Sequence, residues 1–307
     1  MMEALHLGSL AASVRDFADY RFLRDALAAG LLIGVLCSAL SVFVVLKRMV
    51  FVGQGVSHAA FAGVALSLIL FDPSGGGGPG GPGGAGGPEG AGFGAPGGAA
   101  YAVTALYSLA VAFLMAWAIR RGKMSGDSAI GMFFVVSMAL GVLLIASRRA
   151  FTADIFGILF GSILSVTRGD VWAAGGLAAL AGLALLLFFK EAAYYAFDEE
   201  MAELSGLPAG AIHYGFVLLI ALAVVVSIRV VGIILVNAFL VIPGLVGLSL
   251  AKRLPQAIAL SVAAGAGSVA AGLILANHLD APAGATVVVV LFGVYLASLA
   301  GRRLWAA

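Results

Sequence analysis

Two side chains that can bind a metal ion lie four residues apart in the stretch 50–71, which carries no formal charge. This stretch is long enough to cross a hydrocarbon core of ~30 Å as a helix, and at this spacing Gln54 and His58 share one helical face. Imidazole is a good ligand for zinc, manganese, iron or nickel, and an amide oxygen is a weaker one. Because polar groups at membrane depth are costly unless they face a cavity or a partner, the pair predicts an incomplete metal site. The alternative is a histidine hydrogen-bonded to a neighbouring backbone carbonyl.

A second polar stretch is VVGIILVNAFLVIPG, residues 230–244. It contains the amide of Asn237, and Pro243 removes a backbone hydrogen bond, which predicts a kinked helix. Broken helices at membrane depth are tolerated where they line a cavity. We therefore expect this span to line the same path, with ordinary helix packing as the alternative.

A third polar cluster is Asn277, His278 and Asp280 in ANHLDAPAGAT. Carboxylate and imidazole groups at the outer end of a span would suit a metal-binding cluster at the entrance of a path. Polar residues at a membrane boundary are also commonly just solvated, and this alternative stays open. The two remaining histidines, His6 and His213, suggest no role.

The composition predicts the elements that must position these groups. The 307 residues are 62% hydrophobic and 10% charged, whereas a soluble chain carries roughly a quarter charged residues. We therefore expect an all-α, polytopic membrane protein with about nine membrane helices, within a range of eight to ten. The expected spans are 25–46, 49–71, 101–119, 129–147, 171–189, two within 211–250 joined by a tight turn at 227–232, 256–276 and 284–300.

The remaining segments are an N-terminal arm and the connections within a single transmembrane domain over 25–303. Residues 1–24 have mixed charge and suit an arm at the membrane surface. Residues 74–98 are rich in glycine and proline, which predicts a loop without a packed core. Residues 151–166 are too short for a comfortable crossing and contain Asp154, which favours an interfacial or re-entrant helix.

The distribution of basic residues predicts the orientation, because cytoplasmic loops carry an excess of lysine and arginine. Ten basic residues end up on one side of the nine expected spans: Lys47, Arg48, Arg120, Arg121, Lys123, Lys190, Lys252, Arg253, Arg302 and Arg303. This side is then cytoplasmic, as is the C-terminus. The N-terminus and the loop 74–98 are predicted to lie outside.

Small residues recur every fourth position on the second span, at Gly55, Ala59, Gly63 and Ser67. Such spacing lets another helix approach the backbone closely. We therefore expect this span to pack inside the bundle, so that the face with Gln54 and His58 does not meet lipid.

The cytoplasmic stretch 191–209 contains a short predicted helix. Asp198 can cap its start, and Gly206 followed by Pro208 can end it. Its apolar residues Phe197, Met201 and Leu204 fall on one face. This face calls for a partner, either the membrane domain itself or another protein.

Several functions are excluded or disfavoured by what the sequence lacks. It has no GxxxxGK[ST] phosphate-binding loop, so any use of ATP must come from a separate chain. Without GxSxG, HExxH or a buried carboxylate pair, an intramembrane enzyme is disfavoured. The single Cys37 supports neither a disulfide nor a cysteine cluster, and a net charge of +2 does not indicate nucleic-acid binding.

Four motifs in order, VGQGVSHAAFAGVAL, FDEEMAELSGLPAG, VVGIILVNAFLVIPG and LDAPAGATVVVV, resemble the permease subunits of bacterial zinc, manganese and iron ABC importers. The resemblance implies a type II ABC importer-like bundle in a bacterial plasma (inner) membrane, with two copies of the chain forming a homodimer. It also implies cytoplasmic ABC ATPase subunits and an extracellular or periplasmic metal-binding protein as partners.

The same resemblance assigns roles to residues. His58 matches the pathway histidine of the family, whereas many members have aspartate at the position of Gln54, which makes this site less anionic. The segment that would dock on the ATPase includes Phe197, Asp198, Glu199, Glu200, Met201, Ala202, Leu204 and Gly206.

Together these features predict a transport subunit without covalently bound cofactor, which imports a divalent transition metal with ATP bound on its partner. Zinc, manganese and iron are the candidate metals. The alternative is a permease for a larger metal chelate of the cobalamin or siderophore type.

Overall fold

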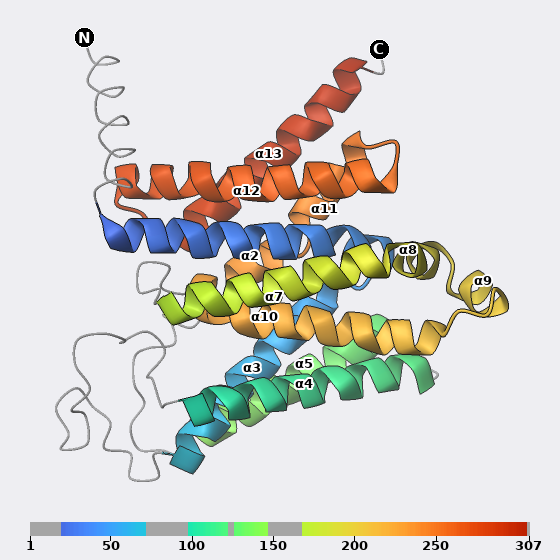
Figure 1. The fold of residues 1–307 in the computed structure, drawn as a ribbon. Coiled ribbons are helices and arrows are strands. Elements are labelled where there is room, and N and C mark those ends of the chain that lie inside the picture. The colour runs from blue at the N-terminus through green and yellow to red at the C-terminus, as the bar shows by residue number, and fades with distance from the viewer. Residues whose placement is uncertain (1–19, 72–97, 122–125, 147–167, 306–307) are drawn as a thin grey trace.

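The computed structural model describes residues 20–71, 98–121, 126–146 and 168–305, and its regular elements are helices (Figure 1). They are α2 (Arg21–Leu46), α3 (Val50–Phe71), α4 (Gly98–Arg121), α5 (Gly126–Ala146), α7 (Arg168–Leu187), α8 (Phe189–Phe197), α9 (Glu199–Leu204), α10 (Ala209–Phe239), α11 (Ile242–Leu250), α12 (Leu254–Leu279) and α13 (Ala283–Trp305). The predicted all-α class is confirmed.

Nine segments of the described residues are long and apolar enough to cross a membrane, as the sequence predicted. The shortest has 18 residues, which at ~1.5 Å per residue spans most of a hydrocarbon core. The predictions for the arm 1–19, for 74–97 in the glycine-rich loop and for the short helix 151–166 lie outside the described residues.

The double span 211–250 changes direction at Gly232, inside the range in which a turn was predicted. Gly232 has φ +81° and ψ 166° within α10. Glycine adopts such a positive φ readily because it has no Cβ. The apolar segments Ala209–Ile228 and Val230–Leu250 therefore form two spans, and the second is broken again between α10 and α11.

Several helix boundaries differ by a few residues from the prediction. The first helix begins at Arg21, four residues before the expected start. Residues 21–24 of the predicted arm therefore belong to α2. The fifth predicted span ends at Leu187, and the following segment forms α8 after Phe188 leaves helical geometry, with φ −107° and ψ 24°. Helix α8 is held by the buried side chains of Tyr195 and Ala196.

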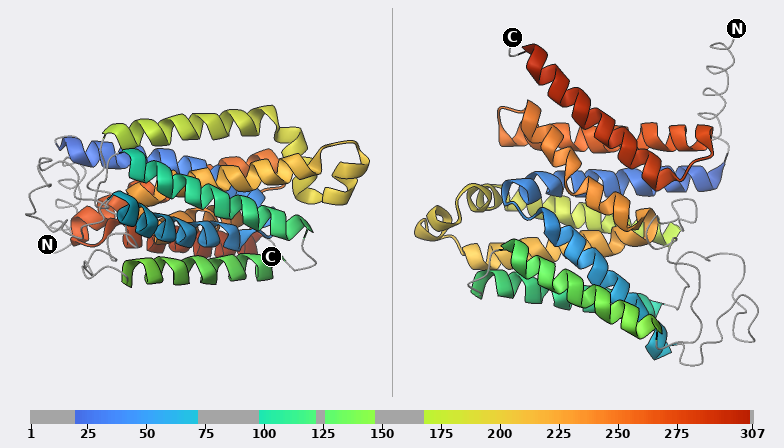
Figure 2. Two further views of the ribbon diagram at one scale, coloured as in Figure 1. Left: turned by 90° about the horizontal axis from the view of Figure 1, so that it is seen from below. Right: turned by 180° about the vertical axis from the view of Figure 1, so that it is seen from behind.

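Helices α2 and α10 lie in the middle of the bundle (Figures 1 and 2). The group α3, α4 and α5 packs on one side of them, and α11, α12 and α13 lie on the other. Of the 18 most apolar consecutive residues of α2, 67% are buried, whereas the same share is 22% in α5 and 17% in α7. Helices α5 and α7 are therefore peripheral, and their exposed apolar side chains suit contact with lipid or with another copy of the chain.

Helices α2, α11 and α12 pack at very close range. A Cβ added at Gly244 of α11 would lie 2.6 Å from the backbone oxygen of Ser41, and one added at Gly247 would collide with the backbone oxygen of Ala257. The hydroxyl groups of Ser41 and Ser261 lie 3.0 Å apart at the same junction. Small residues thus let polar groups of three helices meet away from lipid.

This packing predicts that Gly244→Ala destabilises the bundle. The added methyl group has no space beside the backbone of α2, and such overpacking costs ~1–3 kcal/mol. We expect a lower midpoint of thermal unfolding for the purified protein in detergent. Gly176→Ala on α7 is the matched control, because nothing lies within 4 Å of its added Cβ. Equal midpoints for the two variants would contradict the packing argument.

Candidate functional site

Helix α3 presents Gln54 and His58 on the same face. Gln54 is exposed in the single chain, and His58 is partly buried. The imidazole of His58 meets the ring of Phe134 on α5 edge to face, with centroids 4.4 Å apart. The intervening Ser57 donates a hydrogen bond of 2.8 Å to the backbone oxygen of Gly53, so its hydroxyl is used within the helix.

A cavity of about 290 Å³ lies between α3 and α5 beside Gln54. Its lining consists of Phe51, Gln54, Gly55, Asp127, Ile130, Gly131 and Phe134. The cavity is left open partly because position 131 on α5 is a glycine, which has no side chain to fill the space. At one end of α5, a Cβ added at Gly141 would lie 2.7 Å from the ring of Phe61, whereas at the other end one added at Gly131 would have nothing within 4 Å.

Asp127 is a candidate that the sequence analysis missed. It is the second residue of α5 and lines the cavity together with Gln54. The expected span begins two residues later, at 129, and so leaves Asp127 outside it. An acidic residue next to a span start was the available signal, but only the packing of α5 on α3 places it near the amide.

Among the described residues, no group of three or more histidine, cysteine, aspartate or glutamate side chains could hold a metal ion. The donors near the cavity are one carboxylate, one imidazole and one amide, on two helices. Because a tightly held transition metal generally needs more fixed ligands, this arrangement suits brief contact with an ion better than permanent binding.

Asn237 approaches the same part of α3 from α10. A Cβ added at Gly53 would lie 3.3 Å from Oδ1 of Asn237, so the amide rests on the backbone next to Gln54. Pro243 lies farther along the chain, near the start of α11. There it follows a break in the helix and is buried at the junction with α2, not at the cavity.

The other predicted cluster lies apart from this cavity. His278 is in the last turn of α12, and Asp280 ends that helix with a left-handed backbone, φ +48°. Helix α12 packs on α2, α11 and α13, on the far side of α2 from α3 (Figure 1). The structure thus keeps Gln54 and His58 on one face of α3 and places Asn237 against the backbone beside Gln54, but it does not bring His278 and Asp280 to them.

The small residues of α3 lie against neighbouring helices. A Cβ added at Gly63 would lie 3.0 Å from Cα of Thr104 on α4, and one added at Gly55 would lie 3.1 Å from Sδ of Met115. Ala59 and Ser67 are buried. These contacts keep α4 close to α3.

Helix α9 projects beyond the ends of the membrane helices (Figures 1 and 2). Its start is capped by Asp198, whose Oδ1 accepts a hydrogen bond of 3.0 Å from the backbone N–H of Met201. Its end is closed by Gly206, with φ +81°, and by backbone bonds from Gly206 to Glu203 and from Leu207 to Ala202. These paired bonds form a Schellman motif, which requires a left-handed residue at this position.

The outer face of α8 and α9 is apolar and exposed. Phe197, Met201 and Leu204 are 69%, 58% and 82% exposed. Glu200 and Glu203 on α9 are exposed as well. Large apolar side chains that protrude into water in this way are typical of a docking surface.

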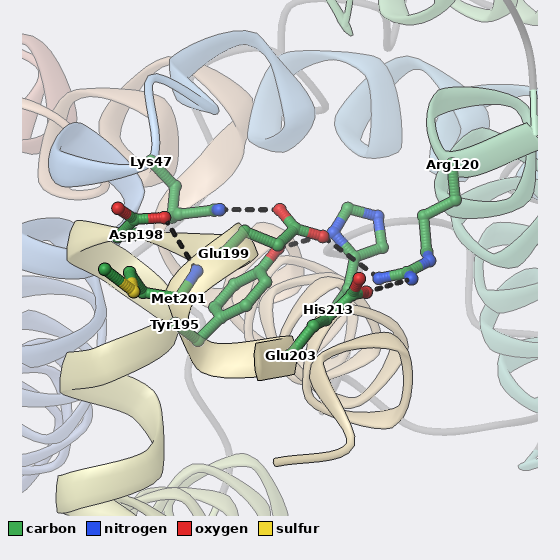
Figure 3. Close-up of polar contacts among 8 residues, drawn as sticks. All are labelled: Lys47, Arg120, Tyr195, Asp198, Glu199, Met201, Glu203 and His213. Atoms are coloured by element: carbon green, nitrogen blue, oxygen red, sulfur yellow. Dashed lines mark hydrogen bonds and ion pairs between the residues drawn. The ribbon is translucent and has the colours of Figure 1, made fainter. Parts of the chain in front are cut away.

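The inner face of α9 is tied to the membrane helices by ion pairs (Figure 3). Oε2 of Glu199 lies 2.8 Å from Nζ of Lys47 at the end of α2, and its Oε1 lies 3.0 Å from Nη1 of Arg120 at the end of α4. Nη2 of Arg120 lies 2.9 Å from Oε1 of Glu203. One carboxylate therefore bridges two cations from different helices.

Tyr195 and His213 lie next to these ion pairs (Figure 3). The Tyr195 hydroxyl lies 2.6 Å from Nδ1 of His213, and the Lys47 ammonium lies 3.9 Å from the centre of the Tyr195 ring. Burial raises the pKa of Tyr195, and the nearby Glu199 carboxylate raises it further. Tyr195 is therefore a neutral phenol at physiological pH. His213, to which the sequence analysis gave no role, is a buried part of this network.

Comparisons with known proteins support a transport role. Residues 19–302 match the ABC 3 transport family. The chain is 30% identical over 273 residues to the manganese transport system membrane protein MntC of Halalkalibacterium halodurans, covering 89% of this chain and 84% of that protein. It is 30% identical over 286 residues to the manganese import system permease protein ScaB of Streptococcus gordonii, covering 93% of each. The solved structure of PsaBC from Streptococcus pneumoniae in complex with Fab matches with a TM-score of 0.76 at 28% identity, over 94% of both chains.

Proposed function

The chain belongs to the ABC 3 transport family, and we propose that it carries manganese across the membrane along a path beside α3. Its family makes it the membrane permease of an ATP-driven metal importer, with ATP hydrolysis on a separate chain. Membership also implies an ATPase and a substrate-binding protein as partners. The metal, the path, the dimer and the orientation are the proposal.

One observation carries the proposed path: Gln54 shares one face of α3 with His58 and lines a cavity together with Asp127. An imidazole and an amide on α3 and a carboxylate on α5 offer a divalent ion ligands from both helices. Asn237 adds a second amide at the level of Gly53. The ion would pass between α3 and α5 toward the end of the bundle that carries α9.

Manganese is the favoured substrate for two reasons. Two relatives that match along nearly the whole chain are named for manganese transport or import. In addition, the donors beside the cavity are mostly oxygen atoms with one imidazole and no thiolate, and carboxylate and carbonyl oxygen atoms suit manganese. Iron and zinc are then competing ions. These relatives favour a metal ion over a larger metal chelate.

The exposure of Gln54 and of the neighbouring helix α5 supports a homodimer. Gln54 is exposed in the single chain, and an amide at this depth is costly when it faces lipid. Helix α5 beside it exposes large apolar side chains along most of its length. A second copy that packs on α3 and α5 would cover both and would complete the path with a second set of ligands.

The proposed orientation puts α9 in the cytoplasm. Lys47 and Arg120 lie at the same end of the bundle as α9, and basic residues accumulate on the cytoplasmic side of membrane proteins. The exposed apolar face of Phe197, Met201 and Leu204 would then dock on the ATPase.

The first prediction concerns His58. In vesicles that contain the chain with its ATPase and binding protein, His58→Ala should lower ATP-dependent manganese uptake at limiting metal by about tenfold or more, which corresponds to ~1.4 kcal/mol. The reason is the loss of the imidazole that shares the α3 face of Gln54 and contacts Phe134, a residue of the cavity lining. Uptake of radioactive manganese, with zinc and iron as competitors, measures the effect and the selectivity together.

The matched control is His278→Ala, which removes a histidine from α12, away from the cavity. We expect near-normal uptake for this variant. Normal uptake by His58→Ala would contradict the proposed path, and preferential uptake of zinc or iron by the wild-type complex would contradict manganese as substrate. An inactive ATPase supplies the background value.

A second prediction concerns Asp127. Asp127→Asn keeps the shape of the side chain but removes the charge that attracts a cation to the cavity. We expect the manganese concentration at half-maximal uptake to rise several-fold, with a larger change at low ionic strength because exposed charges are screened by salt. Asp280→Asn is the control, since asparagine tolerates the left-handed backbone of Asp280. A similar shift in both variants would show that general surface charge, not this cavity, is responsible.

A third prediction tests the dimer. Because Cys37 is buried, a Cys37→Ser chain with Val135→Cys on α5 has one exposed thiol. Under mild oxidation we expect disulfide-linked dimers in membranes, since facing positions near a two-fold axis can approach within ~7 Å. Leu183→Cys on α7 is the control, because Leu183 is 55% exposed and Val135 is 60% exposed. Cross-linking through α7 but not α5 would contradict the proposed interface.

A further inference from the structure

Helix α9 contacts the rest of the protein in two ways. Ala202 packs with Tyr195 and Ala209 in a small buried cluster. The ion pairs of Glu199 and Glu203 form the second contact. The apolar cluster connects α9 to its neighbours in sequence, whereas the ion pairs connect it to helices that are far away in sequence.

The two cations of this network belong to helix ends that lead to the cavity. Lys47 directly follows α2, and after a tight corner, in which Arg48 has φ +56°, α3 begins at Val50. The backbone N–H of Met49 bonds to the oxygen of Val44 at 2.9 Å, which holds this corner closed. Arg120 is the penultimate residue of α4, and α5 begins at Gly126.

Along the sequence, α3 therefore begins three residues after Lys47, and α5 begins six residues after Arg120. Gln54 lies in the second turn of α3, and Asp127 lies in the first turn of α5. We propose that Glu199 is a positioning residue that transmits movement of α9, through Lys47 and Arg120, to the two helices that line the cavity. This inference rests on the proposed docking of α9 to an ATPase.

The geometry suits transmission of a displacement. Glu199 uses both carboxylate oxygens, one for each cation, so moving α9 pulls on two helices together. Lys47 is also held over the ring of Tyr195, and Tyr195 is hydrogen-bonded to His213 on α10. The ammonium group therefore has a defined position and does not simply follow a mobile carboxylate.

The small contribution of these ion pairs to stability separates the proposed role of Glu199 from a role in folding. The side chains of Lys47, Glu199 and Arg120 are 14%, 35% and 26% exposed. Ion pairs with this much access to water contribute little to stability. A variant without the Glu199 charge should therefore fold and assemble, which makes transmission testable.

The test compares Glu199→Gln with Glu191→Gln in the complete complex with ATPase and binding protein. Glu191 lies in the first turn of α8, outside the ion pairs of Glu199 and outside the residues expected to dock on the ATPase. For Glu199→Gln we expect manganese uptake to fall about tenfold while the rate of ATP hydrolysis and the amount of bound ATPase stay near the wild-type values. The control should resemble the wild type in all three measurements.

Two variants of Lys47 test whether the Glu199 charge acts through its ion pair with Lys47. Lys47→Arg keeps a cation and should retain uptake, whereas Lys47→Met should lose it. Combining Lys47→Met with Glu199→Gln should add little further loss, because two residues that act through one contact are not additive.

Hydrogen exchange gives a measurement that needs no metal. ATP binding to the wild-type complex should change exchange in α9 and in residues 49–58, and in Glu199→Gln it should change exchange only in α9. If the wild-type complex imports no manganese, the proposed substrate is wrong, and this measurement still decides the role of Glu199.

Normal uptake by Glu199→Gln would overturn the inference. So would a response of residues 49–58 to ATP that is the same in Glu199→Gln as in the wild type. Loss of bound ATPase from this variant would overturn it as well, because Glu199 would then act in docking.

Discussion

The free-energy cost of placing polar side chains in hydrocarbon is the constraint on which the arrangement around α3 depends. Gln54 and His58 cannot face lipid without loss of stability. His58 is partly buried against Phe134 of α5, whereas Gln54 is exposed in the single chain, so the proposed dimer is what would cover it. The space beside Gly131 thus lets Gln54 and the Asp127 carboxylate line one cavity whose other lining residues are apolar or glycine.

The distribution of apolar and charged side chains is different in α9, which lies beyond the membrane helices. Its apolar side chains point outward and its inner carboxylates meet cations, the reverse of an ordinary surface helix. Exposed ion pairs are weak and can rearrange without unfolding the protein. They can therefore set the direction of a movement while the buried cluster of Ala202, Tyr195 and Ala209 keeps α9 attached.

The sequence was sufficient for features that depend on local chemistry. The nine apolar runs, the turn near Gly232 and the ends of α9 follow from length, glycine geometry and capping. Contacts between distant segments could not be predicted in this way. Nothing in a single sequence pairs Glu199 with Lys47 and Arg120, or places Asp127 beside Gln54, because these contacts depend on how whole helices pack.

The separation of ligands between two helices has a consequence for transport. A carboxylate and an imidazole one turn apart on a single helix keep a constant distance and bind an ion with constant strength. Here the carboxylate of Asp127 lies on α5, whereas Gln54 and His58 lie on α3. In the proposed path, a change in the angle between these helices alters the distance between the ligands. An ion is then held more strongly when the helices are close and is released when they part, so a site of modest affinity can couple its occupancy to the conformation of the permease.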